Sequence, residues 1–186
     1  MKIIISPSKT QKITKIMGFD FKSAIYKDKT DYLVNLMKKF KKEEIKKIMK
    51  TSDKLTNEIY NNYKAFLDEK LGHAAASYTG IAFRSLDIKE FSKKEVEYME
   101  KHLVILSALY GVLTPLTGIK PYRLDMTMSI SKKNSLYEFW QESINEYFEE
   151  EEMIINLASK EFSKMIKKPL INIEKKKKKN EKLVQI

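Results

Sequence analysis

The sequence contains no cysteine, and its only histidines are His73 and His102. Disulfides, thiolate metal sites and cysteine nucleophiles are therefore excluded. Neither histidine has a carboxylate at a metal-ligand spacing. With only two histidines the chain offers few general bases, so the sequence does not indicate a Ser/His/Asp triad. The acidic run at 149–152 is predicted to be a solvated helix end. We therefore expect no metal site, no cofactor and no catalytic triad.

Long apolar runs are also missing. No segment approaches the roughly 18–20 apolar residues that a membrane span needs. The N-terminal MKIIISPSKT is too short an apolar segment for a secretory signal. These absences predict a cytoplasmic protein with no membrane partner. No repeat, proline-rich linker or Gly/Ser tract divides the 186 residues, and 42% hydrophobic content is enough for the core of one domain.

Acidic residues are outnumbered, 25 against 36 lysines and arginines, which gives a net charge of +11. A basic balance suggests a polyanionic partner such as nucleic acid. Six of the lysines lie in 174–186, so the rest of the chain carries 30 basic and 23 acidic residues. Arginine occurs only at Arg84 and Arg123. Almost every other basic residue is lysine. Arginine at these two positions is therefore explained either by chance or by a need for the planar, bidentate guanidinium.

Hydrophobic periodicity predicts an α/β (mixed α+β) fold, a central mixed sheet flanked by helices. Strands are expected at 2–5, 103–106 and 153–155. Helices are expected at 27–70, with breaks near 40–42 and 51–53, and at 92–101, 136–148 and 159–167. The segment 74–83 is expected to be extended, 110–121 to be a loop, and 170–173 to pair with 183–186 as a hairpin.

Polar residues follow the three predicted strands. Ser-Pro-Ser-Lys-Thr occupies 6–10, and Ser, Asn and Ser occupy 107, 156 and 159. If these strands are parallel neighbours, the polar groups gather at one sheet edge, where open α/β sheets usually bind ligands. The cleft residues predicted there are Ser6, Lys9, Thr10, Ser107, Asn156 and Ser159. Lys9 and Thr10 lack the glycines of a P-loop, so they could contact a phosphate or merely cap the next element.

Two short helices around residues 51–54 form a helix-hairpin-helix-like element. Such a unit can present backbone amides and lysines to a DNA phosphate. The residues predicted to do so are Lys46, Lys47, Lys50, Ser52 and Lys54. The turn lacks the glycines usual in DNA-binding hairpins, so an ordinary helical pair with a solvated lysine face is the alternative.

Aromatic residues lie close to both arginines. Tyr78 and Phe83 precede Arg84, and Tyr122 precedes Arg123 and Asp125. Interleaved aromatics and arginines suit nucleic acid or a nucleotide. The alternative is that the aromatics belong to the core, beside a structural Arg–Asp pair.

Seven segments in this chain occur in the same order in the YaaA peroxide-stress family, which the chain resembles from residue 1 to about 173. They are ISPSKT (5–10), SDKL (52–55), YTGIAFRSL (78–86), HLVILSALYGVLTPL (102–116), KPYRLDM (120–126), LYEFW (136–140) and IINLASKEF (154–162). Several are long and unusual, LSALYGVLTPL and PYRLDM especially, which makes coincidence a poor explanation.

This resemblance implies a non-enzymatic, cytoplasmic DNA-binding protein that limits unincorporated iron and oxidative damage under hydrogen peroxide stress. It implies a helix-hairpin-helix-like element over 41–70 with Ser52, Asp53, Lys54 and Leu55 as its signature. It also implies a positively charged cleft lined by Ser6, Lys9, Thr10, Tyr122 and Arg123. DNA would be held by its phosphate backbone with little sequence preference. The residues expected to contact it are Lys9, Lys46, Lys47, Lys50, Ser52, Lys54, Arg84, Tyr122 and Arg123.

Two other functions stay open at this point. The first is an enzyme or binding protein for a nucleotide or phosphorylated metabolite, which would use the Ser/Lys/Arg-lined strand ends and Asp125 or Asp53 as acid or base. The second is direct iron sequestration, which the absence of cysteine and scarcity of histidine disfavour. Family members usually continue further, so we expect 1–173 to be the family domain without its C-terminal part. Residues 174–186 are expected to be a lysine-rich turn and terminal strand or a frayed tail.

Overall fold

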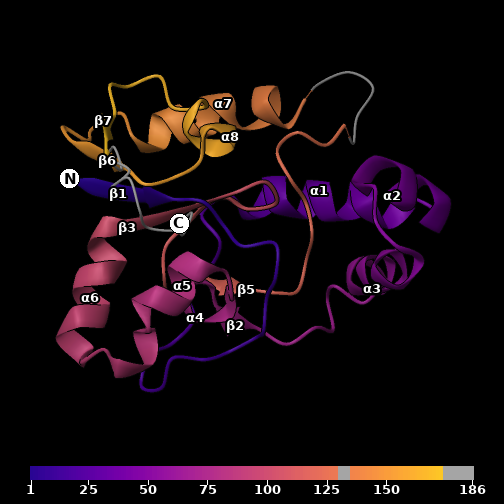
Figure 1. Ribbon diagram of the computed structural model, residues 1–186, viewed down its shortest axis with the longest axis horizontal. Coiled ribbons are helices and arrows are strands. Elements are labelled where there is room, and N and C mark those ends of the chain that lie inside the picture. The colour runs from indigo at the N-terminus through magenta and orange to yellow at the C-terminus, as the bar shows by residue number, and fades with distance from the viewer. Residues whose placement is uncertain (130–134, 174–186) are drawn as a thin grey trace, which may run out of the picture.

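The computed structural model describes residues 1–129 and 135–173. A five-stranded sheet runs through it in the order β4-β3-β1-β6-β7 (Figure 1). Its strands are β1 (Lys2–Ile5), β3 (Leu103–Ser107), β4 (Gly111–Leu113), β6 (Ile154–Asn156) and β7 (Ile171–Asn172). All neighbouring pairs are parallel except β3 and β4, which are antiparallel. The mixed α/β fold expected from the sequence is therefore confirmed.

The three strands predicted from apolar runs lie side by side at the centre of the sheet. In β3 all five residues are buried, as in parallel sheets covered on both faces. Ile4 of β1 pairs with Val104 of β3 on one side and with Asn156 of β6 on the other. The carboxyl ends of β1, β3 and β6 therefore meet at one sheet edge, as predicted.

Helices flank this sheet on two sides. They are α1 (Lys27–Lys39), α2 (Lys42–Met49), α3 (Asp53–Lys64), α4 (Ala74–Ser77), α5 (Ile81–Leu86), α6 (Lys93–His102), α7 (Leu136–Tyr147) and α8 (Lys160–Ser163), with a 3-10 turn η1 (Ile88–Glu90). In Figure 1, α7 and α8 lie above β1 and β3, α4 to α6 lie below them, and α1 to α3 stand to the right. The predicted capping box is present, because Ser92 Oγ accepts from Glu95 N and Glu95 Oε2 accepts from Ser92 N.

Four segments differ from the prediction. The segment 74–83 is not extended: it forms α4 and the start of α5, separated at Gly80, because three alanines favour a helical turn and two of them pack in the core. The expected loop 110–121 contains β4 and β5 (Gly118–Ile119), and β5 pairs with β2 (Gly72–His73) in a small antiparallel sheet. The helix expected to reach residue 70 ends at Lys64, and the one expected over 159–167 is the single turn α8.

The described residues include only the first half of the predicted C-terminal hairpin. Ile171 and Asn172 form β7, which pairs in parallel with β6. Residues 174–186, and with them the predicted tail and the strand at 183–186, lie outside the described residues.

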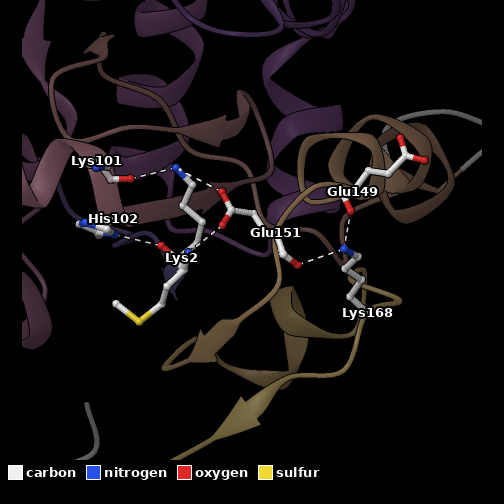
Figure 2. A network of polar contacts seen from close by, with 7 residues as sticks. Lys2, Lys101, His102, Glu149, Glu151 and Lys168 are labelled. Carbon is white, nitrogen blue, oxygen red and sulfur yellow. Dashed lines mark hydrogen bonds and ion pairs between the residues drawn. The ribbon is translucent and has the colours of Figure 1, made fainter.

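A polar network fastens the amino ends of the central strands, opposite the predicted site (Figure 2). The Met1 ammonium donates to Glu151 Oε2 at 3.0 Å, and Lys2 Nζ lies 3.6 Å from Glu151 Oε1. Lys168 Nζ donates to the Glu151 carbonyl at 3.0 Å. Burial opposes ionisation of Glu151, but the ammonium and Lys2 outweigh it and lower the pKa of this carboxyl. The acidic run thus has a structural use, and residues 1–129 and 135–173 hold no cluster of three metal-ligating side chains.

No helix among the described residues is long and apolar enough to cross a bilayer.

Candidate functional site

A cleft of about 160 Å³ opens at the carboxyl ends of the central strands. Three chain segments line it: residues 6–11 after β1, residues 122–125, and residues 159–162 at α8. We call this hollow the strand-end cleft. Its position is the one that open α/β sheets use for ligands.

Two serines join the ends of β1 and β6 at the rim of the cleft. Ser159 N donates to Ser6 Oγ at 2.9 Å, and Ser6 Oγ donates to Ser159 Oγ at 3.1 Å. Asn156 lies further back: its Oδ1 accepts from Ala158 N at 2.9 Å, and its Nδ2 donates to Asn172 Oδ1 at 2.7 Å. Ser6 and Ser159 therefore line the cleft, whereas Asn156 shapes the turn behind it.

A buried chain of hydroxyls lies beneath the cleft. Tyr122 OH lies 2.8 Å from Ser107 Oγ and 2.7 Å from Tyr78 OH, and Ser107 Oγ also accepts from the backbone N–H of Leu109 and Tyr110. Burial raises the pKa of Tyr122 to about 12 and that of Tyr78 well above its usual value. These hydroxyls stay protonated at neutral pH. The rings of Tyr78 and Tyr122 are 3% and 6% exposed, so here the core interpretation of the aromatics applies rather than stacking on a base.

Four charged side chains line the cleft. Lys9 Nζ lies 3.1 Å from Asp125 Oδ2, with the lysine 61% exposed and the aspartate 16%. Glu161 Oε1 accepts from Met126 N at 3.0 Å. Arg123 Nε is buried with no hydrogen-bond partner among the described residues. Two cations therefore face two carboxylates, so these lining residues do not by themselves make the positive cleft implied by the resemblance.

The Arg123–Asp125 pair, which the sequence left open as an alternative, is not formed among the described residues, where Asp125 pairs with Lys9. Arg123 is instead fixed through its backbone, because its carbonyl accepts from Tyr63 OH of α3 at 3.0 Å. An anion entering the cleft would therefore compete with Asp125 for Lys9, while the Arg123 guanidinium keeps an unused donor.

Thr10 and Arg84 lie on a neighbouring segment. Thr79 Oγ1 donates to Thr10 Oγ1 at 2.8 Å, and Arg84 Nη1 donates to the Thr79 carbonyl at 3.0 Å. Both residues are exposed, and they tie the loop after β1 to the connection between α4 and α5. Arg84 is therefore held by the backbone and not by a carboxylate among the described residues.

The helix-hairpin-helix-like element is formed by α2, α3 and the turn 50–52 between them. Lys50 adopts the left-handed conformation, φ 50°, that glycine usually supplies in such turns. Ser52 caps α3 by accepting from Leu55 N. Lys46 pairs with Asp53 at 2.6 Å, so its charge is partly neutralised. The other three lysines predicted to contact DNA here, Lys47, Lys50 and Lys54, are exposed, and we call them the basic turn.

The predicted DNA-binding residues therefore fall into separate groups. The basic turn lies at the start of α3, and Arg123 contacts Tyr63 near its end, about 15 Å further along a helix that rises 1.5 Å per residue. Sequence reasoning missed Gln11 and Glu161 as cleft residues. Gln11 Oε1 accepts from Tyr122 N at 3.0 Å, a contact that depends on the tertiary fold.

Comparison with known proteins supports the resemblance along the whole chain. The family model described as "Peroxide stress protein YaaA" matches residues 1–186. A UPF0246 protein of Finegoldia magna is 44% identical over 170 residues, which cover 91% of this chain and 68% of that protein. A UPF0246 protein of Fusobacterium nucleatum is 39% identical, covering 94% and 74%, and one of Agathobacter rectalis is 40% identical, covering 91% and 70%.

Proposed function

We propose, from the premise that this chain belongs to the YaaA peroxide-stress protein family, that it binds the DNA phosphate backbone through the basic turn. The observation that carries the proposal is that Lys47, Lys50 and Lys54 are all exposed around one turn and form no ion pair within residues 1–129 and 135–173. In the cytoplasm this binding would serve the response to hydrogen peroxide, limiting unincorporated iron and oxidative damage, as the resemblance implies.

The turn suits phosphates rather than bases. Its lysines are point charges without the planar fork that reads a base edge. The first amides of α3 lie beside them and carry the positive end of the helix dipole, although Ser52 already caps one of these amides. Lys9 and Arg123 would extend contact to a second phosphate position, about 15 Å away along α3. Little sequence preference is therefore expected.

We expect binding to weaken steeply with salt. The three lysines of the basic turn alone predict a slope of about −2.7 in log K against log salt, or roughly a 40-fold loss of affinity between 50 and 200 mM, and contacts from Lys9 and Arg123 would make the slope steeper. Fluorescence anisotropy with a short labelled duplex measures this. Lys47→Gln and Lys54→Gln should each weaken binding and reduce the slope by about one. Lys94→Gln, at an exposed lysine of α6, is the matched control and should change neither.

The Lys50→Gly variant distinguishes a loss of DNA binding from a loss of folding. Glycine relieves the left-handed strain at this position, so the fold should be stabilised by up to about 1 kcal/mol while one phosphate contact is lost. Weaker DNA binding by this more stable variant would support the proposal. Salt-independent affinity, or equal binding by all the lysine variants, would overturn it.

A second function, as a binding protein or enzyme for a nucleotide or phosphorylated metabolite, is favoured by the strand-end cleft. Its support is the buried Nε of Arg123, which has no hydrogen-bond partner within residues 1–129 and 135–173, beside the exposed Lys9. A guanidinium with a free donor suits a phosphate oxygen. Asp125, which lines the same cleft, would be the acid or base if the ligand were also a substrate.

We expect AMP, ATP or ribose 5-phosphate to raise the melting temperature if this function is right. Ligand at 100 times its Kd stabilises by about 2.7 kcal/mol, which is roughly 5–10 °C for a chain of this size. Arg123→Ala and Lys9→Ala should abolish the shift. No shift with any of the three ligands would leave DNA binding as the better account.

A further inference from the structure

A second hollow, of about 430 Å³, lies between the loop 14–19 and the segment from η1 to α6. Its walls are mainly apolar. The apolar side chains used here are Ile16, Phe19, Ala76, Ile88, Phe91 and Val96. We call it the apolar hollow. It is separate from both the strand-end cleft and the basic turn, with which it shares no residue.

The loop 14–19, which forms one wall of the hollow, is fixed by hydrogen bonds to His73. Ile16 N donates to Nδ1 of the buried His73 at 2.8 Å, and His73 N donates to the Thr14 carbonyl at 2.9 Å. Gly18 then turns the loop with φ 80°. These contacts fix the backbone on both sides of Met17, whose side chain is 87% exposed next to the hollow. A large apolar side chain is thus left uncovered beside an apolar cavity.

The charged residues that line the hollow are all lysines. They are Lys15, Lys89 and Lys93, and no carboxylate of the described residues lines it, although Lys93 Nζ lies 4.0 Å from Glu97 Oε1 outside the lining. Lys93 is also the first residue of α6, where the helix dipole adds positive potential. In the strand-end cleft, by contrast, two cations face two carboxylates. The apolar hollow therefore complements a ligand that is apolar at one end and anionic at the other.

We propose that the apolar hollow binds a free single-chain fatty acid, with the alkyl chain against Ile16, Phe19 and Val96 and the carboxylate among the three lysines. The hollow could hold about fourteen methylene-sized groups if each occupied roughly 30 Å³, which is the volume of one water molecule. One chain of ten to twelve carbons fits this space, whereas a two-chain lipid does not. This activity is independent of DNA binding.

Isothermal titration with dodecanoate, below its micelle concentration, tests the proposal. Each buried methylene should strengthen binding about fourfold, so decanoate should bind roughly 15 times more weakly than dodecanoate. Dodecyltrimethylammonium, with the same chain and the opposite charge, should not bind. Lys89→Glu and Lys93→Glu should each weaken dodecanoate binding at least tenfold, whereas Lys94→Glu, one position outside the hollow, should not.

A thermal melt of each variant separates lost binding from lost folding, since all three lysines are exposed. Ala76→Leu, which fills the hollow without changing its charge, should also reduce binding. Equal affinity for the cationic surfactant would overturn the proposal. So would association with anionic phospholipid vesicles without any binding of monomeric dodecanoate, because that result would indicate a membrane surface as the partner.

Discussion

Gly111→Ala is expected to lower the free energy of unfolding by about 3 kcal/mol. Gly111 has φ 72°, a left-handed conformation that costs other residues roughly 1–2 kcal/mol. A β-carbon at this position would lie 2.6 Å from Trp140 Cζ3 and 2.7 Å from its Cε3. The indole cannot move aside easily, because it is fully buried and its Nε1 donates to the Ala108 carbonyl at 2.8 Å. Overpacking of this kind adds about 1–3 kcal/mol.

Gly18→Ala is the matched control for backbone strain. Gly18 has a similar φ of 80°, but a β-carbon there would meet nothing within 4 Å. We expect it to cost about 1 kcal/mol, so urea denaturation of the two variants isolates the contribution of the clash with Trp140. An equal loss of stability in both variants would show that the ring accommodates the new methyl group.

The central sheet, and the gathering of polar residues at one of its edges, could be predicted because both depend on local patterns. Runs of buried aliphatic residues mark β1, β3 and β6, and the polar residues that follow them lie at one edge because these strands are parallel neighbours. The capping box of α6 was also readable, since all its groups lie within four residues.

The charged contacts of the site could not be predicted in the same way. The sequence left open, as an alternative, that Asp125 pairs with Arg123, two positions away. The structure pairs Asp125 with Lys9, because the loop after β1 passes beside residues 122–125. The parallel pairing of β7 and the short helices α4 and α5 could not be predicted for a similar reason. Contacts between segments distant in the sequence decide these elements, and local propensity is too weak to identify them.

His73 has a structural role that its chemistry alone does not reveal. The sequence did not support it as a metal ligand and indicated no other role. In the structure it is 1% exposed, its Nδ1 accepts from Ile16 N at 2.8 Å, and its Nε2 lies 3.3 Å from the Asp20 carbonyl. Its ring packs on Phe21 at 4.4 Å between centroids. An acceptor at Nδ1 requires the neutral imidazole with its proton on Nε2.

Stability is therefore expected to fall as the pH drops below about 6.5. Burial lowers the pKa of His73 from its usual value of 6.5, with the charge of Lys15 acting in the same direction. Below pH 6.5 His73 of the unfolded chain binds a proton that His73 of the folded chain does not bind. Protonation therefore stabilises the unfolded state relative to the folded state. The free energy of unfolding should fall by up to about 1.4 kcal/mol per pH unit until the folded pKa is reached, and stay constant above neutral pH.

Urea denaturation between pH 5 and 8 should show this slope in the wild type and in His102→Gln but not in His73→Gln. The carboxyls with lowered pKa values, Glu95 and Glu151, lose their stabilising effect only below their usual pKa of 4.5, so they do not contribute to this window. Amide exchange at Ile16 provides a local readout, because protonation of His73 removes the acceptor of that N–H. Faster exchange at Ile16 below pH 6.5, before global unfolding, would place the effect in the loop 14–19. A flat stability profile in the wild type would mean that the folded protein accommodates the imidazolium.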